Sequence, residues 1–299
     1  MHKLQNKILT IIACVLWGSA FVGGKLGFGY TTPIHLSGIR FTLAGLLLIP
    51  LLFYQKIDWK AHLKEWRYLL LFGFIQSFVQ YGLFFVGLNM VDASISAIII
   101  GGGPLFIALM AHFTLPDDKL TLRKTFAIIL GMVGIVFVSV TSGSRLSLNT
   151  VFYVGVIILI LSNLVGATTN IIVAKNRNRV NPIVLTAAAN LTGGIMLYIA
   201  SIFLEDWTLQ IYPTKFYLIW IWLAIIPAAG FSIWYSLLKD PEVKVSELNI
   251  WKFLTPVSGV ILSWIILPNE EPNISSILGI IIISIALITL QWQPQKRKG

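Results

Sequence analysis

The sequence predicts an all-α integral membrane protein, with ten transmembrane helices arranged as two inverted repeats of five helices. Three observations support this prediction: ten long apolar stretches, a one-sided distribution of Lys and Arg, and similarity between the two halves of the chain. Of the 299 residues, 57% are hydrophobic and 11% are charged, whereas soluble domains carry roughly 25% charged residues. So few charges would not cover the surface of a soluble fold of this length.

Ten stretches approach or exceed the roughly 20 apolar residues that a helix needs to cross a bilayer. A β-barrel is not expected, because runs such as 98–100 and 280–283 lack alternation. The first stretch, which follows Lys3 and Lys7, is long enough to span and has no clear cleavage site, so we interpret it as a helix and not as a signal peptide. The stretches are 8–28, 33–54, 66–89, 93–115, 123–141, 151–174, 182–204, 215–237, 245–267 and 273–292.

Lys and Arg residues give this map an orientation. With the amino terminus in the cytoplasm, 17 of the 22 Lys and Arg residues lie in cytoplasmic segments. Only Arg145 and Lys215 lie on the opposite side, and Lys25, Arg40 and Lys252 lie within helices. Because cytoplasmic loops are enriched in Lys and Arg, both termini are expected in the cytoplasm, with the chain in the cytoplasmic (inner) membrane. The net charge of +10 is thereby explained, and no nucleic-acid partner is expected.

The two halves of the chain repeat one pattern. Residues 91–94 (VDAS) with Pro104 match residues 243–246 (VKVS) with Pro256 at a constant offset of 152. We therefore expect one repeat over 1–146 and a second over 147–299. Five spans are an odd number, so the second copy must lie inverted. Inverted repeats are typical of secondary transporters, whose substrate site lies near the membrane midplane between the repeats.

Short motifs give the chain a family resemblance. They are LWGSAF at 16–21, IRFTLAG at 39–45, the stretch from Ala93 to Pro104, and the Asn269-Glu270-Glu271 turn. In order and spacing the sequence resembles the drug/metabolite transporter superfamily, specifically its ten-helix EamA-type members. The resemblance implies a transporter of amino acids, other metabolites or amphipathic drugs, often moved outward, without a cofactor. Residues 116–118 (PDD) depart from the Gly-Glu pair usual in that family.

Polar residues recur at helical spacing in three predicted spans. Gln76 and Gln80 are four residues apart and share a face. Asn163 and Asn170, with a glycine between them, form a second stripe, and Asn249 begins a third that runs through Lys252. Such stripes either line a cavity or hold helices together. We predict that these residues line a substrate cavity.

Two basic residues lie deep within the predicted spans. Lys252 is eight residues into its span, about 12 Å deep at 1.5 Å per residue. It is interpreted as a ligand for a substrate carboxylate or a proton-exchange site; the alternative is a structural partner for a carbonyl or for Glu247. For Arg40 we expect a structural role in hydrogen bonding between helices. Lys25 lies near a span end, from which its ammonium can reach the interface.

Aromatic residues and prolines complete the predicted site. Trp17, Tyr81, Trp234 and Trp251 are expected to enclose an amphipathic substrate. Pro104 and Pro256 are predicted hinges; close helix packing is the alternative. Their place in the two repeats favours the hinges.

The sequence predicts neither catalytic residues nor a metal site. Cys14 is the single cysteine, and no nucleotide-binding or hydrolase motif is present. The leading hypothesis is a secondary transporter, expected to export, driven by the substrate gradient or an exchanged ion. The alternatives are a membrane-embedded enzyme acting on a lipid, and a scaffold without polar lining. The expected partners are a small-molecule substrate and the lipid bilayer; a homodimer is left open.

Overall fold

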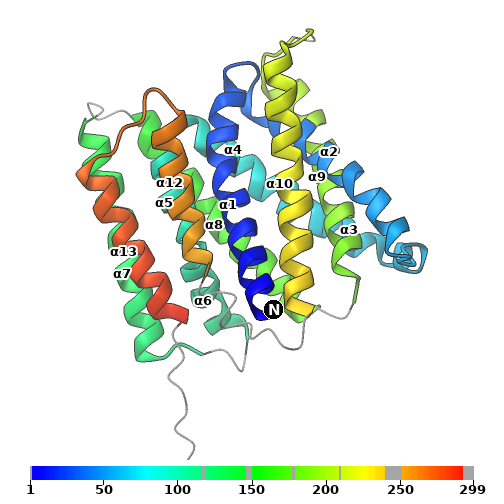
Figure 1. The fold of residues 1–299 in the computed structure, drawn as a ribbon, viewed down its shortest axis with the longest axis horizontal. Helices are drawn as coiled ribbons and strands as arrows, with labels where there is room; N and C mark the ends of the chain where they lie inside the picture. The colour runs from blue at the N-terminus through cyan, green and yellow to red at the C-terminus, as the bar shows by residue number, and fades with distance from the viewer. Residues whose placement is uncertain are drawn as a thin grey trace, which may run out of the picture.

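The computed structural model describes residues 2–115, 119–145, 150–176, 179–208, 210–239 and 251–291, whose regular structure is entirely helical. Nine stretches within these ranges are long and apolar enough to cross a membrane, and Trp251–Ile266 is a shorter apolar one. These stretches run side by side (Figure 1) and confirm the predicted all-α fold of ten spans. The helices are α1 (His2–Phe28), α2 (Pro33–Tyr54), η1 (Lys60–Glu65), α3 (Trp66–Gly73), η2 (Phe74–Gln80), α4 (Tyr81–Met90), α5 (Ala93–Gly101), α6 (Gly103–Thr114), α7 (Leu122–Arg145), α8 (Thr150–Lys175), α9 (Pro182–Leu204), α10 (Thr214–Lys239), η3 (Trp251–Phe253), α12 (Leu254–Ile266) and α13 (Ile274–Gln291).

Three predicted spans are not continuous α-helices where the structure describes them; the described part of the ninth begins with the 3-10 helix η3 before α12. The third consists of α3, the π-helix η2 and α4, and the fourth is divided between α5 and α6 at Gly102. Pro104 explains the second interruption, because proline has no N–H to donate to the preceding turn. The π-helix has no comparable signature in the sequence. Such segments are frequent at functional sites.

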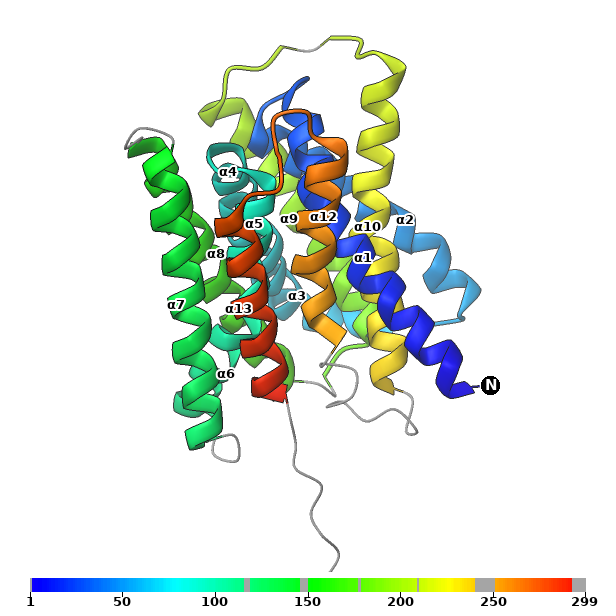
Figure 2. The ribbon, with the colours of Figure 1, turned by 60° about the vertical axis from the view of Figure 1, so that its left-hand side comes forward.

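The ten spans pack symmetrically. Figures 1 and 2 show two of the pairs, α7 beside α13 and α5 beside α12. The first span packs against the eighth and ninth, and correspondingly the sixth packs against the third and fourth. If each span of the first half is replaced by the corresponding span of the second, and the reverse, the same contacts result. Spans of one half pack mainly against spans of the other. The pairs are α2 with α9, α5 with α12, α7 with α13, α1 with α10 and α12, and α8 with α4 and α6.

The contact between α2 and α9 depends on glycine. A Cβ atom at Gly45 would lie 2.7 Å from the backbone nitrogen of Leu191, and one at Gly38 would lie 2.6 Å from that of Tyr198. Neither position has room for a side chain. Small residues let transmembrane helices approach at the backbone, where dispersion contacts stabilise the pair.

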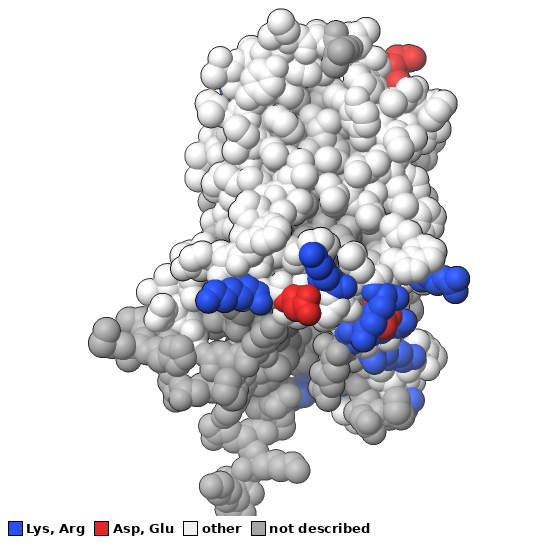
Figure 3. Space-filling model, turned by 90° about the vertical axis from the view of Figure 1, so that its right-hand side faces the viewer, with Lys and Arg blue, Asp and Glu red and all other residues white. Residues whose placement is uncertain are grey.

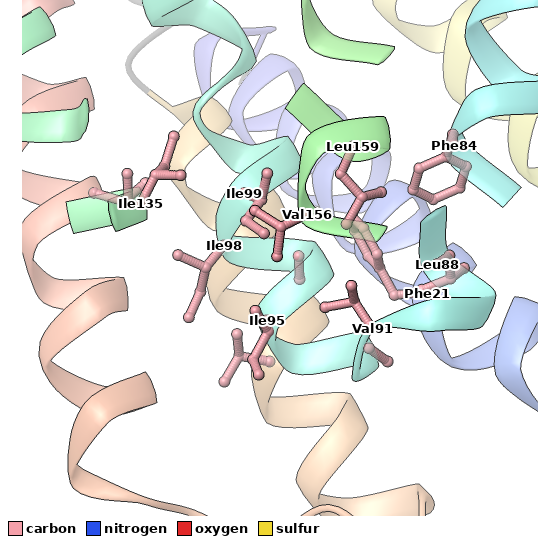
Figure 4. Packing of buried hydrophobic residues seen from close by; sticks show 14 of the residues in the cluster. Phe21, Phe84, Leu88, Val91, Ile95, Ile98, Ile99, Ile135, Val156 and Leu159 are labelled. Carbon is pink, nitrogen blue, oxygen red and sulfur yellow. The ribbon is translucent and has the colours of Figure 1, made fainter. Parts of the chain in front are cut away.

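Branched aliphatic side chains fill the bundle beside α5. Figure 4 shows Ile95, Ile98 and Ile99 of α5 between the side chains of neighbouring helices. Ile98 and Ile99 are fully buried, and Leu159 of α8 and Phe21 of α1 pack into the same cluster. In the account below, the side at which α1 begins is called the N-terminal side, and the side at which it ends is called the opposite side. This cluster lies around the half of the fourth span that is nearer the opposite side.

The outer surface is apolar over the middle of the molecule. Large side chains such as Ile157, Val136 and Ile281 are about half exposed, as expected of residues that face lipid tails rather than water. On the face drawn in Figure 3, Lys and Arg gather towards the N-terminal side, below a broad uncharged band. A bilayer would cover this band.

A candidate substrate cavity

A cavity of about 360 Å³ lies between spans of both halves of the chain. This volume falls within the range of roughly 300–1,000 Å³ that is usual for small-molecule sites. Its lining combines aromatic and aliphatic side chains with amides, hydroxyls and two cations. The lining residues are Trp17, Ala20, Phe21, Arg40, Phe72, Gln76, Gln80, Tyr81, Phe84, Ile100, Gly101, Gly103, Pro104, Ile107, Ser162, Asn163, Gly166, Ala167, Thr169, Asn170, Val173, Ile226, Pro227, Phe231, Trp234, Lys252 and Thr255.

The cavity occupies the middle of the bundle and the half nearer the N-terminal side. On α8 the lining runs from Ser162 to Val173, towards the end of that helix, and on α10 it runs from Ile226 to Trp234. In the fourth span it begins only at Ile100, beyond the middle of α5. Each of these helices runs from the opposite side to the N-terminal side. The cavity therefore extends towards the N-terminal side.

Phenylalanine rings lie at the other end of the cavity. Phe21 and Phe84 line it, are buried, and meet edge to face with 5.5 Å between ring centroids. Phe85 meets Phe84 at 5.3 Å and Phe28 at 5.8 Å. These four rings continue from the cavity wall to the end of α1.

Eight of the ten residues predicted to bind substrate line this cavity. Trp251 does not; its carbonyl oxygen accepts a hydrogen bond from the Cys14 thiol at 3.4 Å. Asn249 lies outside the described residues, as does Glu247. The eight are Trp17, Gln76, Gln80, Tyr81, Asn163, Asn170, Trp234 and Lys252.

The amide of Asn163 supports the interruption of the fourth span. Its Nδ2 donates to the carbonyl oxygen of Ile99 at 2.8 Å, one turn before the break at Gly102. The same oxygen also accepts the Gly102 N–H at 3.1 Å, so Asn163 is its second donor beside the break. Asn163 therefore holds the wall of the cavity in shape as well as facing its interior.

Hydroxyl groups of α8 support the π-helix in the same way. Ser162 Oγ donates to the carbonyl oxygen of Gln80 at 2.9 Å. Thr169 Oγ1 lies 2.8 Å from the Gly166 carbonyl oxygen of its own helix and 3.3 Å from Gln80 Oε1, and its single proton can be given to either oxygen. Asn170 instead bonds within its own helix, with Nδ2 donating to the Gly166 carbonyl oxygen at 2.8 Å. The two predicted polar stripes therefore meet across the cavity.

The two predicted hinge prolines lie at the crossing of the fourth and ninth spans. Pro104 is the second residue of α6 and lines the cavity. Pro256 lies against Gly101, where a Cβ would come within 2.7 Å of the proline Cγ. Gly259 also packs closely, since its Cβ would lie 2.8 Å from Ala97 Cβ. On α12, Pro256 and Gly259 therefore pack against the fourth span, whereas Lys252, which precedes α12, lines the cavity.

An aromatic cluster forms one wall. The Trp17 ring lies 5.3 Å from that of Trp234 and 5.8 Å from that of Phe231. The ammonium of Lys252 lies 4.7 Å from the centroid of the Trp234 ring. Cation–π contacts of this kind stabilise a partly desolvated ammonium. A flat apolar group could lie against these rings.

Arg40 also lines the cavity, although the sequence predicted only a structural role in hydrogen bonding for it. It is only 2% exposed, and its guanidinium carbon lies 4.5 Å from the Phe41 ring and 4.8 Å from the Phe85 ring. Nε and Nη1 have no hydrogen-bond partner among the described residues. The expected hydrogen bonding between helices is therefore not what holds these nitrogens. The sequence signal that could have indicated a place at the cavity was a charged residue seven residues inside a predicted span.

Two carboxylates link the halves of the chain on the opposite side. Glu205, just after α9, accepts hydrogen bonds from the N–H groups of Ile34 and His35, each at 2.8 Å, at the start of α2. Glu270, just before α13, accepts from the N–H groups of Ala93 at 2.5 Å and Ser94 at 2.8 Å, at the start of α5. Anionic groups at a helix N-terminus satisfy unpaired N–H groups and complement the helix dipole.

The model of the EamA-like transporter family matches this chain twice, over residues 7–140 and 153–291. The chain belongs to the EamA-like transporter family. Curated relatives include the uncharacterised transporter YvbV of Bacillus subtilis, 24% identical over 99% of this chain and 95% of its own length. The uncharacterised transporter YoaV of the same organism is 22% identical over all of both chains. An uncharacterised transporter of Archaeoglobus fulgidus is 23% identical over 97% of this chain and 99% of its own.

A solved crystal structure has the same fold. It superposes with a TM-score of 0.70 and covers 96% of this chain and 97% of its own, at 16% sequence identity. At that identity the likeness concerns the fold alone. Together with the family match, it confirms the resemblance that the sequence motifs indicated. The protein is a multi-pass membrane transporter of the drug/metabolite superfamily, and a lipid bilayer is its environment.

Proposed function

We propose that this protein is a secondary transporter that carries a small amphipathic metabolite or drug across the cytoplasmic membrane by alternating access. The observation that carries the proposal is the cavity of about 360 Å³ lined by spans of both halves. Its lining is mostly apolar, with a few amides, hydroxyls and cations that can fix orientation. Residues 1–146 and 147–299 are the two repeats that would move against each other.

The position of the cavity supports alternating access. It extends from the middle of the bundle towards the N-terminal side, and the Phe21 and Phe84 rings lie at its other end. Such a cavity corresponds to one of the two states of a transporter. Pro104, after the break at Gly102, and Pro256, packed on Gly101, provide places at which spans four and nine can bend.

We propose outward transport with both termini in the cytoplasm. The excess of Lys and Arg at the N-terminal side supports this orientation. A cavity that extends towards that side would load from the cytoplasm, as an exporter does. Members of the EamA-type family, which the sequence resembles, often move their substrates outward.

A membrane-embedded enzyme is less well supported by the lining. Among the described residues, those that line the cavity include no Asp, Glu, His or Cys that could act as an acid, base or nucleophile. No group of three or more such residues that could hold a metal ion occurs in the described part of the chain. The names of the relatives are likewise those of transporters.

Release from proteoliposomes tests the proposal. Vesicles with the purified protein would be loaded with a mixture of amino acids, organic acids, amines and aromatic compounds, without ATP, and their release followed by mass spectrometry. At least one compound should leave faster than from protein-free vesicles. Ile107→Trp, which fills the cavity, should abolish this release, whereas Ile157→Trp, on the lipid-facing surface, should not. Release no faster than from protein-free vesicles would overturn the proposal.

A further inference from the structure

The cavity lining has a one-sided charge. Arg40 and Lys252 are basic, and no carboxylate lies among the described lining residues. The acids of the described residues lie in loops or near the ends of spans, as do Asp92, Glu205 and Glu270. A cation in a membrane interior is costly unless an anion or water compensates it.

Arg40 shows the lack of compensation most clearly. The side chain is almost completely buried at the cavity wall, and Nε and Nη1 lack any hydrogen-bond partner among the described residues. Stacking on Phe41 and Phe85 satisfies the faces of the guanidinium but leaves Nε and Nη1 without acceptors. The N–H donors of a guanidinium pair with the oxygens of a carboxylate, sulfonate or phosphate.

Lys252 adds a second positive charge from another wall. Its ammonium contacts the face of Trp234 at 4.7 Å, beside Trp17. The amides of Gln76 and Asn170 line the space without a negative charge. The cavity as a whole therefore offers positive potential together with apolar ring surfaces.

We propose that the transported molecule is an organic anion: an oxyanion head group compensates Arg40 and Lys252, and an apolar body lies against Trp17 and Trp234. This inference rests on the proposed transport function. An acceptor entering the cavity would supply the hydrogen bonds that the Arg40 nitrogens lack. A molecule with a net positive charge would be repelled by both residues, so the cavity selects against amines.

Binding of matched probes to the purified full-length protein tests this. Compounds with the same phenyl body would be compared by the quenching of tryptophan fluorescence: 3-phenylpropionate, 2-phenylethanesulfonate, the neutral 3-phenylpropanol and the cationic 3-phenylpropylamine. At least one anion should bind ten times or more tightly than the alcohol, and the amine should bind weakest. The inference is overturned if no anion exceeds the alcohol or if the amine binds best.

Variants assign the effect to the two cations. Arg40→Gln and Lys252→Gln should each weaken anion binding about tenfold or more and leave alcohol binding unchanged, whereas Arg40→Lys should retain part of the preference. The control Lys215→Gln, on the exposed start of α10, should have no effect. If anion binding is undiminished in Arg40→Gln, the inference is overturned. If Arg40→Gln does not fold, undiminished anion binding in Lys252→Gln overturns it instead.

Transport of the same probes separates this inference from the function on which it rests. If proteoliposomes carry the alcohol or the amine but neither anion, transport stands and the anion inference fails. If none of the four probes and no compound of the loaded mixture moves, the transport function itself fails. Selective movement of an anion supports both.

Discussion

The carboxylate of Glu270 accepts the backbone N–H of Ser94 at 2.8 Å, although 176 residues separate them in the chain. It also accepts the N–H of Ala93, so one side chain of the second half caps a helix of the first. Asp92 immediately precedes that helix but makes no side-chain capping bond. The two halves are therefore joined at the opposite side, where α5 begins.

Glu270→Ala should destabilise the protein. It leaves two N–H groups at the start of α5 without an acceptor, which typically costs about 1 kcal/mol. Thermal unfolding in detergent should show a lower melting temperature, with Glu270→Gln in between because its amide oxygen still accepts. Glu271→Ala, at the exposed neighbouring position, is the matched control. Equal effects at 270 and 271 would contradict the capping role.

Asp92 gives the stability a pH dependence. Burial raises the pKa of its carboxyl above the ordinary 3.8, the nearby Glu270 carboxylate raises it further, and Lys25 opposes the rise. A raised carboxyl pKa means that the folded state binds the proton more tightly than the unfolded state does. Ionised Asp92 therefore lowers the free energy of unfolding above its folded-state pKa, and this cost disappears as the pH falls towards 3.8.

Asp92→Asn should consequently raise the melting temperature at pH 8. The difference from the unchanged protein should narrow as the pH is lowered towards 4, because the native carboxyl then becomes protonated. Melting curves recorded at several pH values for both proteins measure this. A difference that stays constant over the range, or a variant that is less stable at pH 8, would argue against the direction of the shift.

Asn163→Ala should destabilise the bundle more than Asn170→Ala. Asn163 satisfies the Ile99 carbonyl beside the interrupted fourth span, whereas Asn170 bonds to its own helix. The Gly102 N–H still donates to the Ile99 carbonyl at 3.1 Å in the variant, so the loss is that of one buried hydrogen bond, about 0.5–1.5 kcal/mol. The same thermal-unfolding measurement compares the two variants, and a larger loss at Asn170 would refute the supporting role of Asn163.

Gly45→Ala should loosen the contact between α2 and α9. The added Cβ would lie 2.7 Å from the Leu191 backbone nitrogen, so the helices must separate, and such overpacking costs about 1–3 kcal/mol. Gly29→Ala is the control, because its Cβ would only meet the Leu26 carbonyl oxygen at 3.5 Å. If Gly45→Ala has the same melting temperature as the unchanged protein, the contact between α2 and α9 does not depend on this close approach.

Much of the fold follows from the sequence because lipid imposes simple requirements. Apolar length predicted the spans, and the family resemblance is confirmed by the family match. Helical spacing also predicted which side chains share a face, since Gln76 and Gln80 both line the cavity, as do Asn163 and Asn170. That these residues bind substrate stays a prediction.

Contacts between distant segments were beyond the sequence. The Gln80 carbonyl at the end of the π-helix Phe74–Gln80 accepts a hydrogen bond from Ser162 of α8, and α5 is capped by Glu270. Arg40 was assigned to hydrogen bonding between helices, but it stacks on Phe41 and Phe85 because span two turns that face towards α4. The sequence shows that Arg40 is charged and lies deep in a span, but it does not show which side chains surround the guanidinium.

Access to the cavity from the two sides of the membrane tests the central claim most directly. Gln80→Cys in a Cys14→Ser background would be labelled with a membrane-impermeant thiol reagent added to one side at a time, with and without Glu270→Ala. Weakening the Glu270 cap should speed labelling from the opposite side and slow it from the N-terminal side, since one state grows at the expense of the other. Labelling rates that change in the same direction on both sides, or labelling confined to one side in both proteins, would contradict alternating access.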